Sequence, residues 1–290
     1  MRYLYSVSVL CVVGVVHGVT QLHDVVYMVC RRSSSILTFD ATTLQRLTEI
    51  VVKDLRMPYD IAACEQTSRL YVADWSCIWR VSTDGTDIKR WLPKSPSDTF
   101  RPESLSVTST RLLVTSRYSH QLTQFDSVGD QLRRLQLPDD MTPWHAVESP
   151  TGTFIVSLHN EQLKQGQVVE VNNVGEVLRH FGGSLGDTPH VAVDSNGNVF
   201  VADYHNCRIL LLDNRMSLRR ITIEEHQLHN KEPRCLCYNE QSGQLLVGLW
   251  HDVGVFDVLC RNKTAESTQR DVDKKECGLS FLCGDAMVSL

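Results

Sequence analysis

The repeated unit of this chain is clearest in residues 188–203, which read Thr-Pro-His-Val-Ala-Val-Asp-Ser-Asn-Gly-Asn-Val-Phe-Val-Ala-Asp. This stretch predicts a strand, a tight turn at Asn196-Gly197 and a second strand, because an Asn-Gly pair readily adopts the positive φ angles of a two-residue hairpin. A third apolar run, residues 207–213, follows a polar loop. Such continuous apolar runs are typical of strands buried on both faces.

The same pattern recurs at intervals of 40, 44, 41, 46 and 44 residues, with the six copies marked by Gly18, Pro58, Pro102, Pro143, Pro189 and Pro233. A fourth strand is expected in four of the copies, over residues 88–92, 131–137, 176–181 and 218–223. One such sheet cannot bury both of its faces, but radial stacking buries them all. The sequence therefore predicts an all-β fold, a six-bladed β-propeller of four-stranded blades.

The sixth copy has no fourth strand after Val253–Asp257, and the N-terminal run Leu4–Val13 stands in the fourth-strand phase. Pairing these two ends would close the ring and remove an exposed sheet edge. The alternative is a secretory signal peptide, since Arg2 followed by an apolar run also fits that pattern. The first alternative predicts a cytoplasmic protein and the second a secreted one.

The chain contains ten cysteines, most of them within apolar runs. Free cysteine behaves as a small buried hydrophobe, so we expect reduced thiols in an intracellular protein. We expect residues 1–260 to form the propeller. Residues 261–290 are predicted to be a polar, disordered C-terminal tail.

The repeat resembles the NHL family: Pro-x-(Gly/Asp)-(Val/Ile)-Ala, a turn, Val-x-Val-Ala-Asp, a polar loop, then Arg-Ile and an apolar strand ending in Asp. Residues 188–213 match almost throughout, and residues 57–81 match well. The resemblance implies the six-bladed propeller that tripartite-motif proteins carry at their C-termini, where it binds proteins or RNA. Some extracellular enzymes share this propeller. Ubiquitin-ligase activity is not inferred, because the sequence shows no Cys/His spacing typical of a RING or B-box.

In propeller enzymes, metal ligands and acid/base groups lie at the channel mouth, where the innermost strands begin. The repeat places six residues there: His17, Asp60, Ser104 (or Glu103), His145, His190 and Arg234. Imidazole and carboxylate groups suit zinc or a similar ion, so the metal candidates are His17, Asp60, His145 and His190. The alternative is that a wet channel mouth is polar without holding any ligand.

No catalytic residues and no cofactor are predicted. A phosphate-binding Walker loop and a dinucleotide fingerprint are missing from the sequence. The letters Gly-x-Ser-x-Gly occur at residues 182–186, but this run is expected to be a flexible loop between blades rather than the strand-to-helix turn of a nucleophile elbow. The Glu, Asn and Asp ligands of lactonase-like propellers do not occur at the matching positions. The sequence therefore favours a protein that is not an enzyme.

Aromatic residues follow the second strand of several copies and should crowd one face: Trp75, Tyr118, Tyr204 and Trp250. Aromatic side chains are enriched in binding hot spots, although they can also pack between blades. We predict a non-catalytic scaffold that binds a protein through these residues. The alternatives are a metal-dependent hydrolase or lyase at the channel mouth, and an RNA-binding propeller.

The net charge of −5 counts against a nucleic-acid surface, and DNA is not an expected partner. A membrane is not expected either, since the N-terminal apolar run is too short to span one. Basic pairs recur in the fourth strands, at Lys89-Arg90, Arg133-Arg134, Arg179-His180 and Arg219-Arg220, and Arg31-Arg32 lies in a loop. We interpret the four strand pairs as charges that block edge-to-edge pairing rather than as a phosphate-binding ring.

Overall fold

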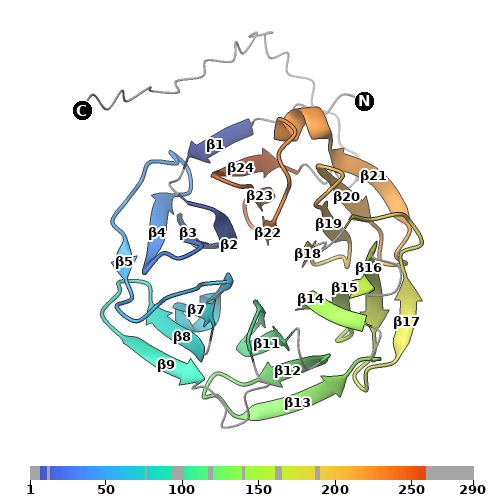
Figure 1. Cartoon of the computed structure of the whole chain (residues 1–290), viewed down its shortest axis with the longest axis horizontal. Helices are drawn as coiled ribbons and strands as arrows, with labels where there is room; N and C mark the ends of the chain where they lie inside the picture. The colour runs from blue at the N-terminus through green and yellow to red at the C-terminus, as the bar shows by residue number, and fades with distance from the viewer. Residues whose placement is uncertain are drawn as a thin grey trace, which may run out of the picture. The chain divides into compact units, whose positions relative to one another are not determined.

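The computed structural model describes residues 7–11, 14–75, 77–92, 101–116, 120–138, 141–160, 165–186 and 190–258. In this part of the chain, six four-stranded antiparallel sheets are arranged in a ring around a channel (Figure 1). The only helices among these residues are two short 3₁₀ turns, η1 (Glu65–Thr67) and η3 (Glu225–Leu228). The predicted all-β, six-bladed propeller is confirmed.

From the channel outward, blade 1 contains β2 (Val16–Leu22), β3 (Val25–Cys30), β4 (Ser35–Asp40) and β5 (Ile50–Val51). Blade 2 contains β6 (Asp60–Cys64), β7 (Arg69–Asp74), β8 (Cys77–Ser82) and β9 (Ile88–Leu92). Blade 3 contains β10 (Ser104–Thr108), β11 (Arg111–Ser116), β12 (Gln121–Phe125) and β13 (Gln131–Gln136).

Blade 4 contains β14 (Met141–Glu148), β15 (Phe154–Asn160), β16 (Gln165–Val171) and β17 (Val177–His180). Blade 5 contains β18 (His190–Val193), β19 (Val199–Asp203), β20 (Arg208–Leu212) and β21 (Leu218–Ile223). Blade 6 contains β22 (Cys235–Asn239), β23 (Gln244–Gly248), β24 (Asp252–Asp257) and β1 (Val7–Cys11).

The N-terminal strand β1 takes the outer position of blade 6, beside β24 (Figure 1). The two strands are antiparallel and pair over five residue pairs, from Val7 opposite Phe256 to Cys11 opposite Asp252. The sequence suggested a longer strand, and its residues 4–6, 12 and 13 lie outside the described part of the chain. That the mature protein keeps this segment remains a prediction.

The hydrophobic core lies in the seams between blades. Each of six buried clusters joins facing side chains of two neighbouring blades, and one of them joins blade 6 to blade 1. In the seam between blades 3 and 4, for example, Leu122 packs in one cluster with Phe154, and both are fully buried. The innermost strands contact one another around the whole ring, β22 and β2 included. No blade buries its faces alone, so the ring is one cooperative unit.

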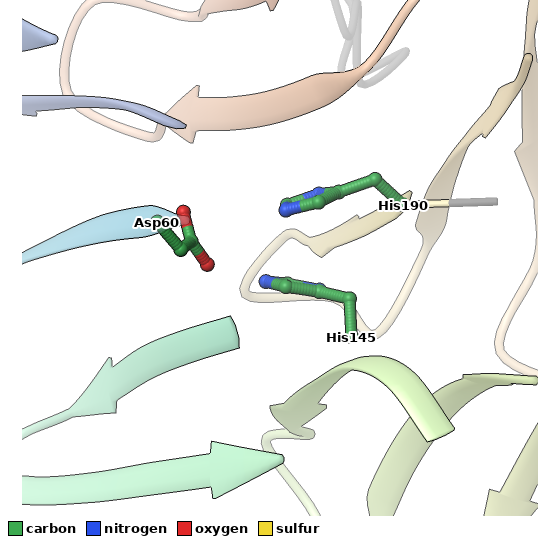
Figure 2. Close-up of side chains that lie close together, drawn as sticks. All are labelled: Asp60, His145 and His190. Carbon is green, nitrogen blue, oxygen red and sulfur yellow. The ribbon is translucent and has the colours of Figure 1, made fainter. Parts of the chain in front are cut away.

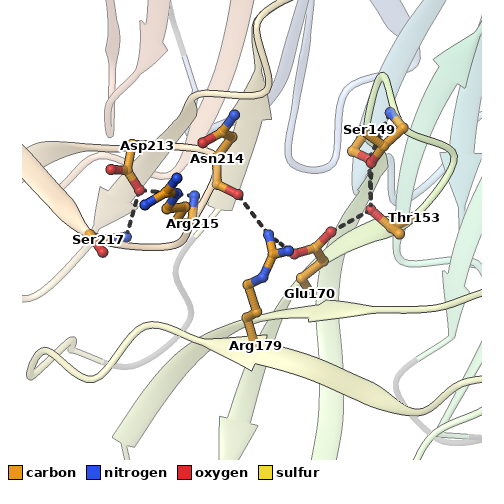
Figure 3. A network of polar contacts seen from close by, with 9 residues as sticks. Ser149, Thr153, Glu170, Arg179, Asp213, Asn214, Arg215 and Ser217 are labelled. Atoms are coloured by element: carbon orange, nitrogen blue, oxygen red, sulfur yellow. Dashed lines mark hydrogen bonds and ion pairs between the residues drawn. The ribbon is translucent and has the colours of Figure 1, made fainter.

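Basic residues of the outer strands reach the neighbouring blade. Arg179 on β17 forms an ion pair of 3.0 Å with Glu170 and donates to the Asn214 carbonyl of blade 5 at 2.9 Å (Figure 3). The Arg133 guanidinium lies 5.9 Å from the ring centroid of Phe154 in blade 4. These two arginines therefore tie blades together at the rim.

Six cysteines lie among the residues whose side chains are described, and all are free thiols: Cys30, Cys64, Cys77, Cys207, Cys235 and Cys237. Burial raises the pKa of the Cys235 thiol well above its usual value. Within the described ranges, no helix has the length and apolar character needed to span a membrane.

Candidate functional site

A cavity of about 500 Å³ opens at the end of the channel where the innermost strands begin. All six blades contribute to it, because each innermost strand starts at this end. The six positions expected from the repeat all line it: His17, Asp60, Ser104 together with Glu103, His145, His190 and Arg234. Its volume falls within the range of small-molecule and side-chain pockets.

Three of the four metal candidates meet in this cavity. The carboxylate of Asp60 and one ring nitrogen each of His145 and His190 lie within 4.8 Å of one another. The two imidazoles stack with ring centroids 3.5 Å apart, and both point toward Asp60 (Figure 2). His17 lines the same cavity but is not part of this cluster.

Asp60 joins blade 2 to blade 3. Its Oδ1 accepts from the N–H of Ile61 at 2.8 Å, and its Oδ2 accepts from the N–H of Leu105, on β10, at 2.9 Å. Its side chain is buried, and this burial raises its pKa to about 7 even though the Leu105, Ile61 and Ser104 hydrogen bonds act in the opposite direction.

The close approach of blade 1 to Asp60 explains one marker glycine of the repeat. A Cβ atom at Gly18 would lie 2.7 Å from the Ile61 nitrogen and 2.8 Å from Asp60 Oδ1. Any larger residue would push the Asp60 carboxylate out of place, so glycine fits this position of β2.

Both stacked histidines are held neutral. Burial lowers the pKa of His145 to about 3, and burial together with the neighbouring His145 lowers the pKa of His190 well below its usual value. His190 Nδ1 accepts from the Leu236 N–H of blade 6 at 3.3 Å, so the proton of the neutral ring is on Nε2. A metal-binding histidine normally has the opposite arrangement, with a free lone pair on Nε2 and a proton donated from Nδ1.

On the blade 6 side, Arg234 lines the cavity and lies within cation–π distance of two aromatic rings. The Arg234 guanidinium carbon lies 4.1 Å from the Trp250 centroid and 5.1 Å from the Tyr204 centroid. Its Nη2 donates to the Tyr204 hydroxyl at 2.8 Å. Trp250 Nε1 in turn donates to Glu232 at 2.9 Å, so the cation is held by aligned groups from two blades. We call Arg234, Tyr204 and Trp250 the arginine clamp.

Trp75 lies at the same end of the ring, on blade 2. It is 45% exposed, and the Arg101 guanidinium lies 4.5 Å from its ring centroid. Its ring centroid is 6.3 Å from that of Tyr59, which lines the cavity. Tyr118, the fourth predicted aromatic residue, lies outside the described residues.

The sequence interpretation missed the position of Arg31, which lines the cavity beside His17. The sequence does contain a signal for this position of Arg31. Arg31 directly follows β3, the second strand of blade 1, just as Trp75 and Tyr204 directly follow the second strands of blades 2 and 5. The antiparallel order returns each second strand to the end where the first one began, so all these residues reach the channel mouth.

A comparison with family models and a comparison with solved structures both agree with this architecture. The family model of the NHL repeat matches residues 191–210, in blade 5. No curated protein matches the chain. A streptogramin B lyase structure is similar with a TM-score of 0.61 and 12% identity, over 87% of this chain and 97% of that one.

Hydrazine synthase of Kuenenia stuttgartiensis is similar with a TM-score of 0.59 and 12% identity, over 83% of this chain and 94% of that one. A chain of a nidogen/laminin complex is similar with a TM-score of 0.59 and 15% identity, over 73% of this chain and 81% of that one. At these identities, the likeness shows the fold and not the activity. This chain is therefore a six-bladed β-propeller whose fifth blade matches the family model of the NHL repeat.

Proposed function

We propose that the chain is a non-catalytic binding scaffold that holds a protein partner on the face around the channel mouth. The observation that carries this proposal is the combination of a cavity with exposed indole rings beside it: Trp75 is 45% exposed and Trp250 is 41% exposed. Tryptophan and arginine are the residues most enriched in binding hot spots, and here each indole has an arginine stacked on it.

The scaffold beneath this face is suited to binding with little rearrangement. The cavity residues stand on innermost strands that contact one another around the ring. A preformed surface loses little conformational entropy when a partner binds. The similarity to a chain of a nidogen/laminin complex also supports a protein partner, since that structure contains two proteins. We assign the protein to the cytoplasm on the basis of its free thiols, of which Cys30, Cys64, Cys77 and Cys235 are buried.

A metal-dependent hydrolase or lyase is the second candidate, and the cluster of Asp60, His145 and His190 supports it. Metal binding through His190 Nε2 would require a proton on Nδ1 and would break the hydrogen bond from Leu236. The geometry therefore favours the scaffold. Stoichiometric zinc in the purified protein would instead favour the metal-dependent enzyme over the scaffold. RNA is the third candidate, and salt-sensitive binding of single-stranded RNA would support it.

The test of the proposed function is partner capture with a double variant, Trp75→Ala and Trp250→Ala. A matched control is Val128→Ala with Val174→Ala, because these exposed valines lie in the turns after β12 and β16, at the opposite ends of their blades. We expect proteins captured from the native source by the wild type and by the valine variant to be lost from the tryptophan variant. Equal capture by all three would contradict the assignment of this face.

A further inference from the structure

We propose that the sector of the cavity between blades 6 and 1 binds a carboxylate of the protein partner, an Asp or Glu side chain, through Arg234 with support from Arg31. This inference rests on the proposed function and adds the chemistry that the partner must carry. It is drawn from the arginine clamp, from the charges around it and from the shape of a guanidinium group.

The clamp limits how the guanidinium can bind a ligand. The rings of Trp250 and Tyr204 both lie within cation–π distance of the guanidinium. The Tyr204 hydroxyl oxygen accepts a hydrogen bond from one of the guanidinium N–H groups. The remaining N–H groups lie in the plane of the guanidinium. A carboxylate is the ligand that matches this planar fork, because its two oxygens can accept two parallel N–H bonds.

A second layer fixes the clamp in place. Glu232 accepts from Trp250 Nε1 and also bonds to the Tyr204 hydroxyl, so its carboxylate orients both rings. Burial, followed by the bond to Glu232, raises the pKa of Tyr204 to about 12. The phenol therefore stays neutral at physiological pH and does not neutralise Arg234.

Among the described residues, neither Arg234 nor Arg31 has a carboxylate oxygen within 4.0 Å. By contrast, the arginines at positions 111, 179 and 208 all form ion pairs. Both charges act inside the cavity. The pKa of His17 is lowered to about 4, first by burial and then by the charges of Arg234 and Arg31. Glu232 acts on Arg234 only through longer-range electrostatics and forms no ion pair of 4.0 Å or less with it, so the two arginine charges exceed the one carboxylate near them and this sector stays cationic.

The opposite wall of the cavity disfavours a polyanion. Glu103, just before β10 of blade 3, lines it, and the whole chain has a net charge of −5. A nucleic-acid strand would bring several phosphates near the Glu103 carboxylate, and like charges repel. One carboxylate on a peptide can reach the clamp without that repulsion. The observations therefore favour an acidic peptide over RNA.

The test uses a fluorescein-labelled Gly-Ser peptide that carries spaced glutamates, the same peptide with glutamines, and a labelled oligouridine RNA. Fluorescence anisotropy is measured with the wild type, Arg234→Ala, Arg234→Lys and the control Arg219→Ala. Arg219 is an exposed arginine on the outer strand β21, so Arg219→Ala changes the net charge of the protein by the same amount as Arg234→Ala. Melting temperatures establish that each variant is folded.

We expect the glutamate peptide to bind the wild type and Arg219→Ala with equal affinity. Its affinity for Arg234→Ala should be about tenfold lower, because one charge-assisted hydrogen-bonded pair is lost. Arg234→Lys should fall between them, because lysine keeps the charge and lacks the fork. The glutamine peptide should bind weakly to every variant. If Arg234→Ala does not fold, the lysine variant and the glutamine peptide still test the proposal.

Equal binding of the glutamate and glutamine peptides, or equal binding to wild type and both Arg234 variants, would overturn the inference. Tighter, Arg234-dependent binding of the RNA would overturn it in favour of a phosphate ligand. If the peptide results fail while Trp75→Ala with Trp250→Ala still loses partner capture, the proposed function stands and only the carboxylate assignment falls. If both experiments fail, the proposed function falls as well.

Discussion

At the scale of single residues, Asp60 and His145 face each other in one cavity with pKa values displaced in opposite directions. Burial disfavours the charged form of each, so the pKa of Asp60 rises to about 7 and that of His145 falls to about 3. Folded Asp60 keeps a proton that the unfolded chain releases above about pH 4, and folded His145 excludes a proton that the unfolded chain binds below about pH 6.5. The two residues must therefore shift stability with pH in opposite senses.

This difference predicts the behaviour of two variants. Relative to Asp60→Asn, the wild type should lose stability as pH rises from about 4 to about 7, by at most about 1.4 kcal/mol per pH unit. Relative to His145→Gln, the wild type should gain stability as pH rises from about 3 to about 6.5. Urea unfolding at steps of pH measures both. Differences that do not vary with pH would contradict the buried, facing arrangement.

Residues were predictable where the repeat alone determines their place. Asp60, His145 and His190 share one phase of the repeat, and a closed ring brings that phase to one end of the channel. The arginine clamp was not predicted, because it depends on the rotamers of side chains from two blades. Glu232 was missed for the same reason, since it lies in the loop before β22 and its role appears only once Trp250 and Tyr204 are in place.

At the scale of elements, β1 has the largest expected effect on stability, because among the described strands it alone pairs with the outer side of β24. Deleting residues 1–13 removes five residue pairs and exposes the edge of β24. Each backbone hydrogen bond contributes about 1 kcal/mol, so we expect a loss of several kcal/mol and aggregation through the open edge.

Urea unfolding and light scattering of the truncated chain test this prediction. Deletion of residues 261–290 is the control and should leave stability unchanged, because we predict that this tail lies outside the propeller. Stability equal to that of the full chain after removal of residues 1–13 would favour a cleaved signal peptide. A mature N-terminus near Val19 in native protein would do the same.

Most strands were predictable from apolar runs and turn residues, and the four expected outer strands appear as β9, β13, β17 and β21. The outer strand of blade 1 was not predicted. β5 is only two residues long, Ile50–Val51, too short to show a pattern of its own. The contacts of Arg179 and Arg133 with neighbouring blades were also beyond prediction, because they depend on the distance between blades.

At the scale of the whole molecule, the ring brings equivalent positions of six divergent repeats together on one surface. The strand order places the starts of the innermost strands and the ends of the second strands at the same end, so polar, cationic and aromatic side chains gather around one cavity. The turns after the third strands lie at the other end. The two faces of the propeller therefore differ in chemistry, and the proposed function requires the partner to meet only one of them.

Site-specific photo-crosslinking tests this requirement most directly. A benzophenone amino acid is placed at Trp75, at Trp250 and, as the control on the other face, at Val128, which is 74% exposed. After irradiation with the captured partner, mass spectrometry identifies the products. The proposed function predicts cross-links from Trp75 and Trp250 and none from Val128. Cross-links from Val128 alone, with none from either tryptophan position, would contradict it.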